Sequence, residues 1–451
     1  MKISAVILAA GQGTRMRSDL PKVLHPLVGR PMAWHALQAA RQVTGSQPVM
    51  VIGHGAEAVR QALGEEAASY VVQDPQLGTG HAVMQAEPLL RGASDLVLVT
   101  YADMPLVRSE TLRQLVAAHQ DYPAAVTLMT VIAADPRGFG RILRSASGQV
   151  QAIVEEAQAT PEQLAIRELN ASVYCFSAEW LWPALGRIPL SPKGEYYLTD
   201  LVGLAVADGL PVRALLAEDP AEMIGVNTRV HLAEAEAQLR RRINQEWMLQ
   251  GVTMINPEAT YIEPGVTIGR DTLLWPDTYL HGETHIGAGC ELGPNTIIHD
   301  SQVGEQCTIL ASVLEGALLE DHVEVGPFAR LRKGAHLAQG VHMGNFGEIK
   351  NSYLGPGAKM GHFSYLGDAT IGAQVNIGAG TITCNYDGTH KHPTEVGEGA
   401  FIGSDTMLVA PVKVGEGART GAGAVVTRDI PPFSLAVGVP ARVIRKLERS
   451  E

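Results

Sequence analysis

Residues 262–298 read IEPGVTIGRDTLLWPDTYLHGETHIGAGCELGPNTII. In this stretch an isoleucine or leucine recurs at every sixth position without a break. The positions are Ile262, Ile268, Leu274, Leu280, Ile286, Leu292 and Ile298. Neither the 3.6-residue period of a helix nor the two-residue alternation of an ordinary strand produces this spacing. The pattern therefore predicts a repeat fold built from six-residue sides.

The same period returns further along the chain, from Val325 to Ile349 and from Ile402 to Val414. Three hexads make one triangular coil, so each buried residue stacks on its counterpart in the next coil and the array fills its own interior. The segment from Val252 onward gives about ten such coils. A glycine often follows the apolar position, which we interpret as a tight turn. These glycines are Gly269, Gly287, Gly293, Gly326, Gly361, Gly372, Gly378, Gly403 and Gly415.

The repeat is preceded by a segment rich in helix formers, TRVHLAEAEAQLRRRINQEWML, which begins at Thr228 and contains no Gly or Pro. It predicts one long helix between domains. The organisation expected is a first domain over residues 1–227, a linker helix over 228–250 and a repeat domain over 251–451.

Residues before the predicted helix follow a different pattern, in which short apolar runs alternate with helical ones. Runs such as Ile3–Leu8, Pro48–Ile52 and Leu96–Thr100 predict strands, and Met32–Gln42 and Ala56–Leu63 predict helices. This alternation is typical of an α/β domain with a parallel sheet covered by helices.

Composition excludes several classes of function. The formal net charge of -12 argues against general binding to nucleic acid or to an anionic membrane, because such proteins carry a basic field. The chain has only four cysteines with no close pair, which argues against a zinc site or a disulfide framework and favours a reducing cytoplasm. No stretch has the roughly 18 to 20 apolar residues of a membrane span.

The segment LAAGQGTRM, residues 8–16, directly follows the first predicted strand and is followed by Lys22. Gly11 and Gly13 let backbone N–H groups approach phosphate oxygens, and Arg15 and Lys22 supply positive charge. The segment lacks the third glycine of a dinucleotide fingerprint and the GK[ST] of a P-loop. Asp103 comes just after the run Leu96–Thr100, at the edge of an open sheet where ligands bind.

The run LAAGQGTRM resembles the nucleotide-sugar pyrophosphorylases, as does GVN (225–227). QDPQLGTGH (residues 73–81) resembles the family's uracil-reading loop. FGR (139–141), VE (154–155), Asn170 and YYLTD (196–200) resemble its sugar-side motifs, which implies that Gly140, Glu155 and Asn170 contact the amino sugar. The resemblance implies a Rossmann-like nucleotidyltransferase fold, catalytic roles for Arg15 and Lys22, and a Mg²⁺ ion held by Asp103 and Asn227. It also implies a set of residues that bind UTP or the nucleotide sugar. These are Leu8, Ala9, Ala10, Gly11, Lys22, Gln73, Gly78, Thr79, Tyr101, Asp103, Gly140, Glu155, Asn170 and Asn227.

Three motifs in the repeat extend the resemblance to nearly the whole chain: GPFARLR (326–332), GHFSYLGD (361–368) and NIGAGTITCNYDG (376–388). They resemble the bifunctional enzymes that are both glucosamine-1-phosphate N-acetyltransferases and N-acetylglucosamine-1-phosphate uridylyltransferases. In that family the repeat forms a left-handed parallel β-helix. His362 is the natural general base for acetyl transfer, since an unperturbed imidazole pKa of about 6.5 lies near working pH.

The resemblance further assigns two groups of contacts in the repeat domain. Sugar-phosphate contacts are Arg332, Lys350, Tyr365 and Asn376. Acetyl-coenzyme A contacts are Ala379, Asn385, Tyr386, Ser404 and Ala422. Many members place an arginine near position 439, where this chain has Val439, and we expect Arg442 to take its place.

The function implied is synthesis of UDP-N-acetylglucosamine, which feeds peptidoglycan and lipopolysaccharide-type envelope synthesis. Acetyl-coenzyme A, UTP, glucosamine-1-phosphate and N-acetylglucosamine-1-phosphate would be the substrates, Mg²⁺ the cofactor, and a cytoplasmic homotrimer the working assembly, with no nucleic acid or membrane partner.

Two alternatives remain open on the sequence. One is a pyrophosphorylase with a single activity, whose repeat domain only oligomerises or senses effectors; His362 and the Asn385–Tyr386 pair argue against it. The other is a non-catalytic scaffold of the same architecture, and the intact Arg15, Lys22 and Asp103 argue against that.

Overall fold

A computed structural model of the chain describes residues 1–133, 135–136 and 138–448. The chain divides into two compact units, Met1–Leu239 and Arg240–Glu451, with the division inside helix α9 (Arg229–Leu249). We call them unit 1 and unit 2. Among the described residues, no helix is both long and apolar enough to cross a bilayer.

Unit 1 is built on one twisted sheet with strand order β11-β7-β10-β6-β1-β4-β5. The strands are β1 (Ile3–Ala9), β4 (Val49–Ile52), β5 (Ser69–Val72), β6 (Leu96–Tyr101), β7 (Val126–Ile132), β10 (Glu168–Ser177) and β11 (Val212–Leu216), with the hairpin β8 (Arg141–Arg144) and β9 (Val150–Val154) beside β10 and a small ribbon of β2 (Pro26–Leu27) and β3 (Arg30–Pro31).

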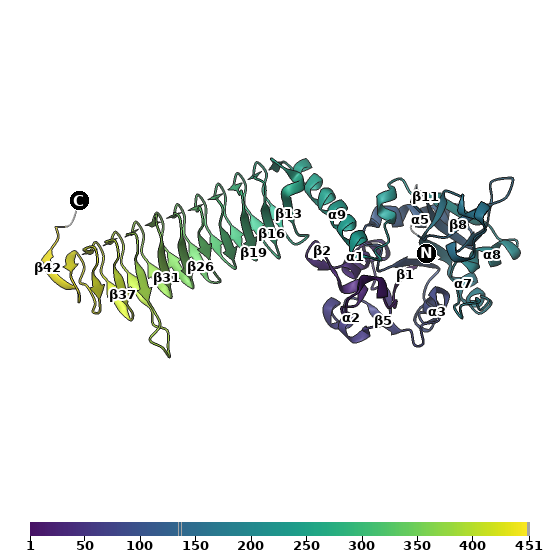
Figure 1. Ribbon diagram of the computed structural model, residues 1–451, viewed down its shortest axis with the longest axis horizontal. Helices are drawn as coiled ribbons and strands as arrows, with labels where there is room; N and C mark the ends of the chain where they lie inside the picture. Colours follow the sequence, from purple (N-terminus) through teal and green to yellow (C-terminus); the bar gives the residue numbers. More distant parts are fainter. Residues whose placement is uncertain (134, 137, 449–451) are drawn as a thin grey trace. The chain divides into compact units, whose positions relative to one another are not determined.

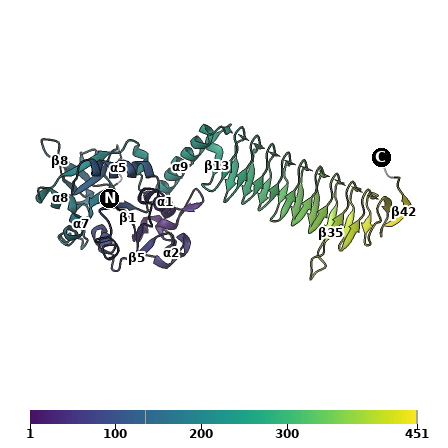
Figure 2. The same ribbon diagram turned by 180° about the vertical axis from the view of Figure 1, so that it is seen from behind.

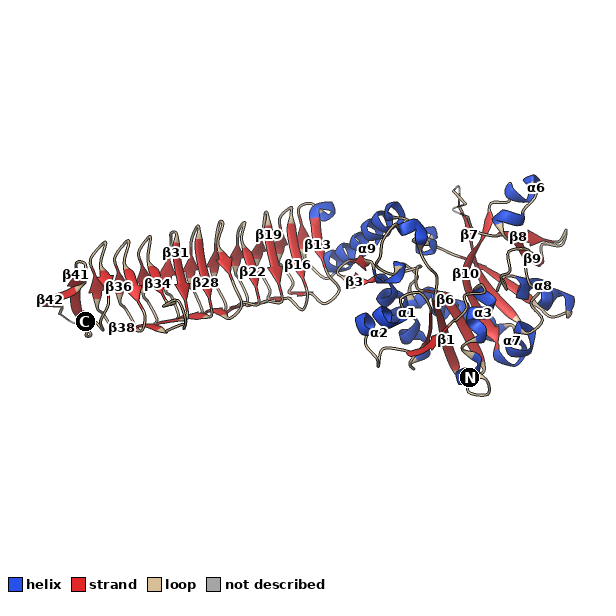
Figure 3. Ribbon diagram, turned by 60° about the horizontal axis from the view of Figure 1, so that its bottom comes forward, coloured by secondary structure: helices blue, strands red, loops and turns tan. Residues whose placement is uncertain are grey.

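Helices cover both faces of this sheet, as Figure 3 shows in blue against red. Side chains of α1 and α5 pack with one face of the strands, and those of α3, α7 and α8 pack with the other. The helices are α1 (Met32–Thr44), α2 (Ala56–Leu63), α3 (Thr79–Met84), α4 (Glu87–Leu90), α5 (Ser109–Asp121), α6 (Pro161–Leu164), α7 (Ala178–Leu185) and α8 (Asp200–Ala207), with short 3₁₀ turns η1 (Thr14–Met16), η2 (Lys22–Leu24), η3 (Glu156–Gln158) and η4 (Pro220–Met223).

The expectation of a parallel sheet is wrong at one strand. β10 runs antiparallel to both β6 and β7, whereas β1 is parallel to β4 and β6. A parallel return needs a crossover, usually a long helix, and the chain between β7 and β10 forms the β8–β9 hairpin and short helical turns instead. The α/β class is confirmed, with a mixed sheet.

Strand order reverses around β1, which lies between β4 and β6. Since β1 and β6 are parallel neighbours, the loops that leave their carboxyl ends lie at the same edge of the sheet, where open α/β sheets bind ligands. The glycine loop follows β1 and Asp103 follows β6, so both predicted elements meet at this edge.

Unit 2 is a stack of triangular coils whose strands form three parallel sheets in the described residues, visible in Figure 1 as the green-to-yellow rungs from β13 to β42. Sheet C contains β12 (Thr253–Met254), β15 (Leu273–Leu274), β18 (Glu291–Leu292), β21 (Thr308–Ile309), β24 (Glu324–Val325), β27 (His342–Met343), β30 (Lys359–Met360), β33 (Asn376–Ile377), β36 (Phe401–Ile402), β39 (Arg419–Thr420), β41 (Ser434–Val437) and the antiparallel β42 (Arg442–Lys446).

The other two sides of the coils have shorter stacks. Sheet D contains β13 (Thr260–Ile262), β16 (Thr278–His281), β19 (Thr296–His299), β22 (Val313–Glu315), β25 (Arg330–Leu331), β28 (Gly347–Lys350), β31 (Ser364–Gly367), β34 (Ile382–Cys384), β37 (Met407–Val409) and β40 (Val425–Val426). Sheet E contains β14 (Thr267–Ile268), β17 (His285–Ile286), β20 (Gln302–Val303), β23 (Leu318–Leu319), β26 (Ala335–Leu337), β29 (Ser352–Leu354), β32 (Ala369–Ile371), β35 (Thr394–Val396) and β38 (Val412–Val414). The turn η5 (Pro257–Ala259) precedes β13.

The six-residue period predicts this core correctly, and its interruptions also have a structural cause. Every predicted position from Ile262 to Ile298 is buried in one continuous hydrophobic cluster. The cluster continues through Val303, Ile309, Leu314 and Leu319 to Val325, so some sides of the coils are five residues long. One missing residue shifts the register of the pattern without breaking the stack.

Glycines that follow the apolar positions are needed mostly for a reason other than a turn. At Gly269, Gly287, Gly372, Gly378, Gly403 and Gly415 an added Cβ would lie 2.4–2.6 Å from atoms of the next coil, and φ is not in the left-handed region. Gly293 and Gly326 do have positive φ, at 96° and 107°. Close stacking of coils is therefore the main constraint, and the tight-turn interpretation holds only for a minority.

One segment leaves the stack. After β34 the chain makes an excursion over residues 385–393 before it rejoins sheet E at β35, and the excursion protrudes near the label of β35 in Figure 2. It contains part of the NIGAGTITCNYDG motif, so a predicted site segment lies outside the repeat itself.

Candidate active sites

The glycine loop of unit 1 lines a cavity of about 640 Å³ at the crevice beside β1 and β6. Most of the nucleotide contacts predicted from the resemblance are part of its wall. They are Leu8, Ala9, Ala10, Gly11, Lys22, Gln73, Gly78, Thr79, Tyr101, Asp103 and Asn227, and Arg15, predicted as catalytic, lines the cavity with them. Motifs that lie far apart in the sequence, such as those of Arg15 and Asn227, thus converge on one hollow.

The two loop glycines have different roles. Gly13 has a φ of 64°, and a Cβ there would lie 2.5 Å from Cβ of Lys22, so the fold itself requires glycine. At Gly11 nothing lies within 4 Å of an added Cβ. Since Gly11 lines the cavity, its missing side chain leaves room for a ligand and exposes its backbone.

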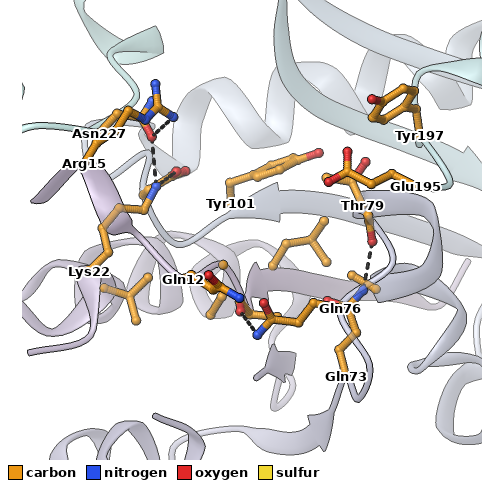
Figure 4. Close-up of a pocket in the computed structure, with 18 residues that line it drawn as sticks. Gln12, Arg15, Lys22, Gln73, Gln76, Thr79, Tyr101, Glu195, Tyr197 and Asn227 are labelled. Atoms are coloured by element: carbon orange, nitrogen blue, oxygen red, sulfur yellow. Dashed lines mark hydrogen bonds and ion pairs between the residues drawn. The ribbon is translucent and has the colours of Figure 1, made fainter. Parts of the chain in front are cut away.

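A cation lies between the two residues predicted to hold the metal. Lys22 Nζ donates to Asp103 Oδ2 at 2.5 Å and to Asn227 Oδ1 at 3.1 Å, and an Arg15 Nη donates to the same Asn227 oxygen at 2.9 Å, as Figure 4 shows. The backbone N–H of Val226 donates to the Asp103 carbonyl, which ties the two loops together. Two side-chain oxygens from distant segments thus converge on one positive charge.

The loop after β5 forms the other end of the cavity. Gly78 has a φ of 93°, and a Cβ there would lie 2.7 Å from the Tyr196 carbonyl oxygen, which explains the glycine. Thr79 Oγ1 accepts a hydrogen bond from the backbone of Leu198. This packing holds the predicted base-reading segment against the loop that contains Tyr196 and Leu198.

Of the three sugar contacts predicted in unit 1, Glu155 lies in a smaller adjoining hollow of about 430 Å³ lined also by Lys193 and Tyr197. Tyr197 lines both hollows, so they adjoin. Glu155 accepts a hydrogen bond from Thr199 Oγ1 at 2.8 Å, and burial raises the pKa of its carboxyl group.

Gly140 and Asn170 lie behind this surface. A Cβ on Gly140 would lie 2.8 Å from Ile153, and Asn170 is 3% exposed. The Asn170 amide donates to the Tyr174 hydroxyl at 2.7 Å and accepts from the backbone of Ser172, so both ends are engaged inside the protein. The structure does not bring these two residues to the cavity wall.

Sequence reasoning missed several residues that the cavity includes. Gln12, Gln76 and Tyr197 line it, and the Gln76 amide donates to the Ala10 carbonyl at 2.7 Å. Each belongs to a motif that the sequence made visible, but a motif does not say which of its polar side chains faces inward.

In unit 2 the predicted sugar-phosphate residues Arg332, Lys350 and Tyr365 lie on or beside neighbouring strands of sheet D. Arg332 forms an ion pair with Glu348 at 2.9 Å. Contact with Lys391, and then the charge of Arg332, lowers the pKa of the Lys350 ammonium. Lys391 comes from the excursion and was not predicted; three cations therefore gather where the sequence suggested two.

His362 occupies the corner between β30 and β31, where sheet C turns into sheet D. Its side chain is exposed rather than packed in the coil, and the structure gives it no hydrogen-bond partner among the described residues. Strand register places Arg332 and Lys350 level with Gly367, five residues further along the same side of the coil.

The predicted acetyl-coenzyme A contacts Ala379, Ser404 and Ala422 form a column at this same corner. Strand register places them in successive coils directly after His362, and backbone hydrogen bonds from Asp405 to Ala379 and from Gly423 to Ser404 maintain the stacking. Beside them, the exposed Phe328, Phe346 and Phe363 are followed in register by Gly380, Asp405 and Gly423. The large side chains stop where the small column begins.

Asn385 and Tyr386 begin the excursion. Asn385 is buried and donates to Asp368 Oδ2 at 2.6 Å, while Tyr386 is exposed and donates to the Gly388 carbonyl at 2.6 Å. Asn376 lies on sheet C and Arg442 on β42, so neither shares the face of Arg332 and Lys350.

Comparison with known proteins finds a different family in each of the two units. A model of the MobA-like NTP transferase domain matches residues 5–175, and a model of the bacterial transferase hexapeptide repeat matches residues 265–300 and 393–428. Relatives named "Bifunctional protein GlmU" are similar over nearly the whole length. That of Heliobacterium modesticaldum is 50% identical over 97% of this chain and 95% of its own, and that of Trichlorobacter lovleyi is 48% identical over 96% and 95%.

Proposed function

Because the chain belongs to the family of bifunctional GlmU proteins, we propose that one polypeptide performs two transfers in sequence. An acetyl group passes from acetyl-coenzyme A to glucosamine-1-phosphate. A uridylyl group then passes from UTP to N-acetylglucosamine-1-phosphate, with release of pyrophosphate. The product, UDP-N-acetylglucosamine, supplies peptidoglycan and lipopolysaccharide-type envelope synthesis in the cytoplasm.

A single observation carries the proposal: the chain is 50% identical to a protein named "Bifunctional protein GlmU" over 95% of that relative's own length. Residues 1–227 would catalyse uridylyl transfer, residues 228–250 would link the domains and residues 251–451 would catalyse acetyl transfer. The His362 motif and the Asn385–Tyr386 pair argue against an enzyme with the uridylyl activity alone.

In the uridylyl half, Gly11 and Gly13 would offer backbone donors to the triphosphate, and Arg15 and Lys22 would neutralise its charge. The sugar phosphate attacks the α-phosphorus, a new P–O bond forms, and the bond to pyrophosphate breaks. Positioning and charge neutralisation account for most of the catalysis in such transfers.

The residues at the crevice fit a magnesium ion. Mg²⁺ prefers oxygen ligands and is usually held by one or two protein groups together with substrate phosphates. Asp103 Oδ2 and Asn227 Oδ1 already converge on the Lys22 ammonium, which occupies a place suited to a cation. When bound, the ion would stabilise negative charge on the phosphates. Lys22 would then pair with a phosphate.

In the acetyl half, Arg332, Lys350 and Lys391 would bind the sugar phosphate, with Tyr365 and Asn376 as further contacts. His362 would remove a proton from the amine as the nitrogen attacks the thioester carbonyl. The tetrahedral intermediate then collapses, the C–S bond breaks, and coenzyme A leaves as its thiolate.

The column of small residues supports the assignment of the coenzyme. From His362 through Ala379 and Ser404 to Ala422 the coils rise about 14 Å, at the usual spacing of neighbouring strands. A pantetheine arm would have room along this column, with its thioester at His362. Asn385 and Tyr386 would be further contacts of the coenzyme. Its phosphates would then lie near Arg442 at the last strand.

We further propose that the working form is a homotrimer, in which a neighbouring copy completes the acetyl site. Phe328 and Phe346 are about 60% exposed and stack at 5.4 Å between ring centres, in line with the exposed Phe363. An aromatic column of this kind beside a catalytic corner favours a protein neighbour. Hexapeptide prisms commonly pack three about an axis.

One incubation tests the proposal. Purified chain receives glucosamine-1-phosphate, acetyl-coenzyme A, UTP and Mg²⁺, and free thiol and pyrophosphate are followed together. Pyrophosphate release should require acetyl-coenzyme A when glucosamine-1-phosphate is the only sugar, and should not require it when N-acetylglucosamine-1-phosphate replaces that sugar. Absence of either product under both conditions would show that one of the two activities is missing.

A further inference from the structure

Behind the base-reading end of the cavity, Gln73, His81 and Gln85 form a hydrogen-bonded chain. The Gln73 amide nitrogen lies 2.9 Å from the Gly78 carbonyl oxygen and 3.1 Å from Nδ1 of His81. The Gln85 amide nitrogen lies 3.1 Å from Nε2 of His81 and 3.1 Å from the His81 carbonyl oxygen. Figure 4 shows Gln73 at the cavity wall, with its hydrogen bond to the Gly78 carbonyl as a dashed line.

The two glutamine nitrogens cannot both donate to His81, because a neutral imidazole has one N–H donor and only one acceptor nitrogen. An amide nitrogen can only donate, so the nitrogens of Gln73 and Gln85 cannot bond to the two ring nitrogens of His81 at the same time. One of the two glutamine amides must therefore present its oxygen to the ring. The amide that presents its oxygen to the ring points its nitrogen elsewhere, and the other amide keeps its oxygen away from the ring.

Burial decides which amide turns. Gln73 is 5% exposed, and its nitrogen also faces the Gly78 carbonyl, which can only accept. Turning Gln73 would place two oxygens against each other in a buried place, at the full cost of an unsatisfied group. Gln85 is only half-buried, so water can replace the contact it loses. His81 therefore has its proton on Nε2 and accepts from Gln73 at Nδ1.

Both amide hydrogens of Gln73 are then used inside the protein, by Gly78 and by His81. What Gln73 offers a ligand is its Oε1 alone, which accepts no hydrogen bond in the described part of the chain, and Gln73 lines the cavity. An acceptor at this position suits the N3–H of a uracil ring. Cytosine has an unprotonated N3, which would face the same oxygen with a second lone pair.

We propose that His81 is the positioning residue that sets the base preference of the uridylyl site, by holding the Gln73 carboxamide with its oxygen toward the nucleotide. The inference rests on the proposed uridylyl activity and adds to it a cause for the choice of base. His81 does not itself line the cavity, so it acts through Gln73. Without an acceptor at this place, Gln73 keeps one of its two internal partners and turns more easily.

The test compares kcat/KM for UTP with that for CTP in the full-length protein and its variants. His81→Phe keeps a ring but removes the acceptor, and His81→Leu is a second variant without an acceptor. His81→Asn places a side-chain oxygen where Nδ1 lies, so it should rescue the hydrogen bond. Acetyl transfer and the melting temperature show that each variant is folded.

We expect the UTP-to-CTP ratio to fall about 3- to 10-fold in the two variants without an acceptor, which is the range for one lost hydrogen bond. His81→Asn should stay within about 2-fold of the original ratio. An unchanged ratio in a folded His81→Phe or His81→Leu protein overturns the inference, and so does an equal fall in all three variants. If the unsubstituted protein fails to turn over UTP, the proposed function fails instead, and the two failures are distinguishable.

Discussion

His362 is the residue whose environment bears most directly on the acetyl half. Since its side chain is exposed, replacing it should disturb chemistry and leave packing intact. General-base catalysis usually contributes about 10² to 10⁴-fold, so His362→Ala should lower acetyl transfer by that range. Uridylyl transfer and the melting temperature should stay as they are. Acetyl transfer within about threefold of the original, in a protein that melts normally, would exclude His362 as the base.

Glu155 gives a prediction about pH. Burial, followed by the neighbouring charges of Asp200 and Glu195, raises the pKa of its carboxyl above the ordinary value of 4.5. Ionising the buried group costs stability, so the stability linked to its neutral form is fully present below pH 4.5 and is lost as pH rises through the folded pKa. Glu155→Gln stays neutral throughout.

The variant should therefore melt higher than the original protein at neutral pH, and the difference should shrink on acidification toward pH 4.5. Melting curves of both proteins across this interval provide the measurement. A difference that grows as the pH falls would mean that the ionised carboxylate is the stabilised form.

For single residues, the sequence motifs predict where the nucleotide cavity lies but not the direction in which each side chain points. Lys22, Asp103 and Asn227 meet as expected, because loops after β1 and β6 must share one edge of the sheet. Asn170 does not reach the wall, since its amide is satisfied inside the protein. Lys391 could not be found from the repeat, because it lies in an excursion with no period.

Among the elements, the sides of the coils allow the sharpest test, because close stacking of neighbouring coils explains the glycines after the apolar positions. A Cβ on Gly287 would lie 2.4 Å from the carbonyl oxygen of Gly304 in the next coil, whereas nothing lies within 4 Å of one on Gly361. Gly287→Ala must separate two coils, and overpacking of this kind costs about 1–3 kcal/mol. Gly361→Ala should change stability by less than about 0.5 kcal/mol.

Urea unfolding of the two variants, followed with a probe in unit 2, measures both changes under the same conditions. Equal stability of Gly287→Ala and Gly361→Ala would contradict the close-stacking explanation. Because neither glycine has a positive φ, backbone strain does not confuse the comparison.

Elements of unit 2 were more predictable from sequence than those of unit 1. The positions from Ile262 to Ile298 are local and repeated, so each coil states the same rule again. In unit 1 the direction of β10 depends on pairing with strands far away in the chain, and an apolar run reads the same in either direction. The six-residue period alone therefore predicts the coils, whereas the mixed sheet of unit 1 can be recognised only in the tertiary structure.

For the whole molecule, the proposed trimer makes the acetyl site depend on assembly. Phe346→Ser removes the central ring of the exposed column Phe328–Phe346–Phe363. Light scattering should report three copies for the original chain and fewer for the variant at the same concentration. Acetyl transfer should fall with the loss of trimer, while uridylyl transfer persists. A variant that is monomeric and acetylates normally would refute the shared site.

The central claim is that one chain contains two separate catalytic sites, and a mixing experiment tests it most directly. Asp103→Asn removes a carboxylate from the uridylyl site, and His362→Ala removes the proposed base from the acetyl site. Each variant alone receives glucosamine-1-phosphate, acetyl-coenzyme A, UTP and Mg²⁺, and so does an equimolar mixture. The account predicts little UDP-N-acetylglucosamine from either variant and rapid formation by the mixture, since N-acetylglucosamine-1-phosphate made by one is used by the other. Loss of both activities in either folded variant, or a mixture that makes no more product than its components, would contradict it.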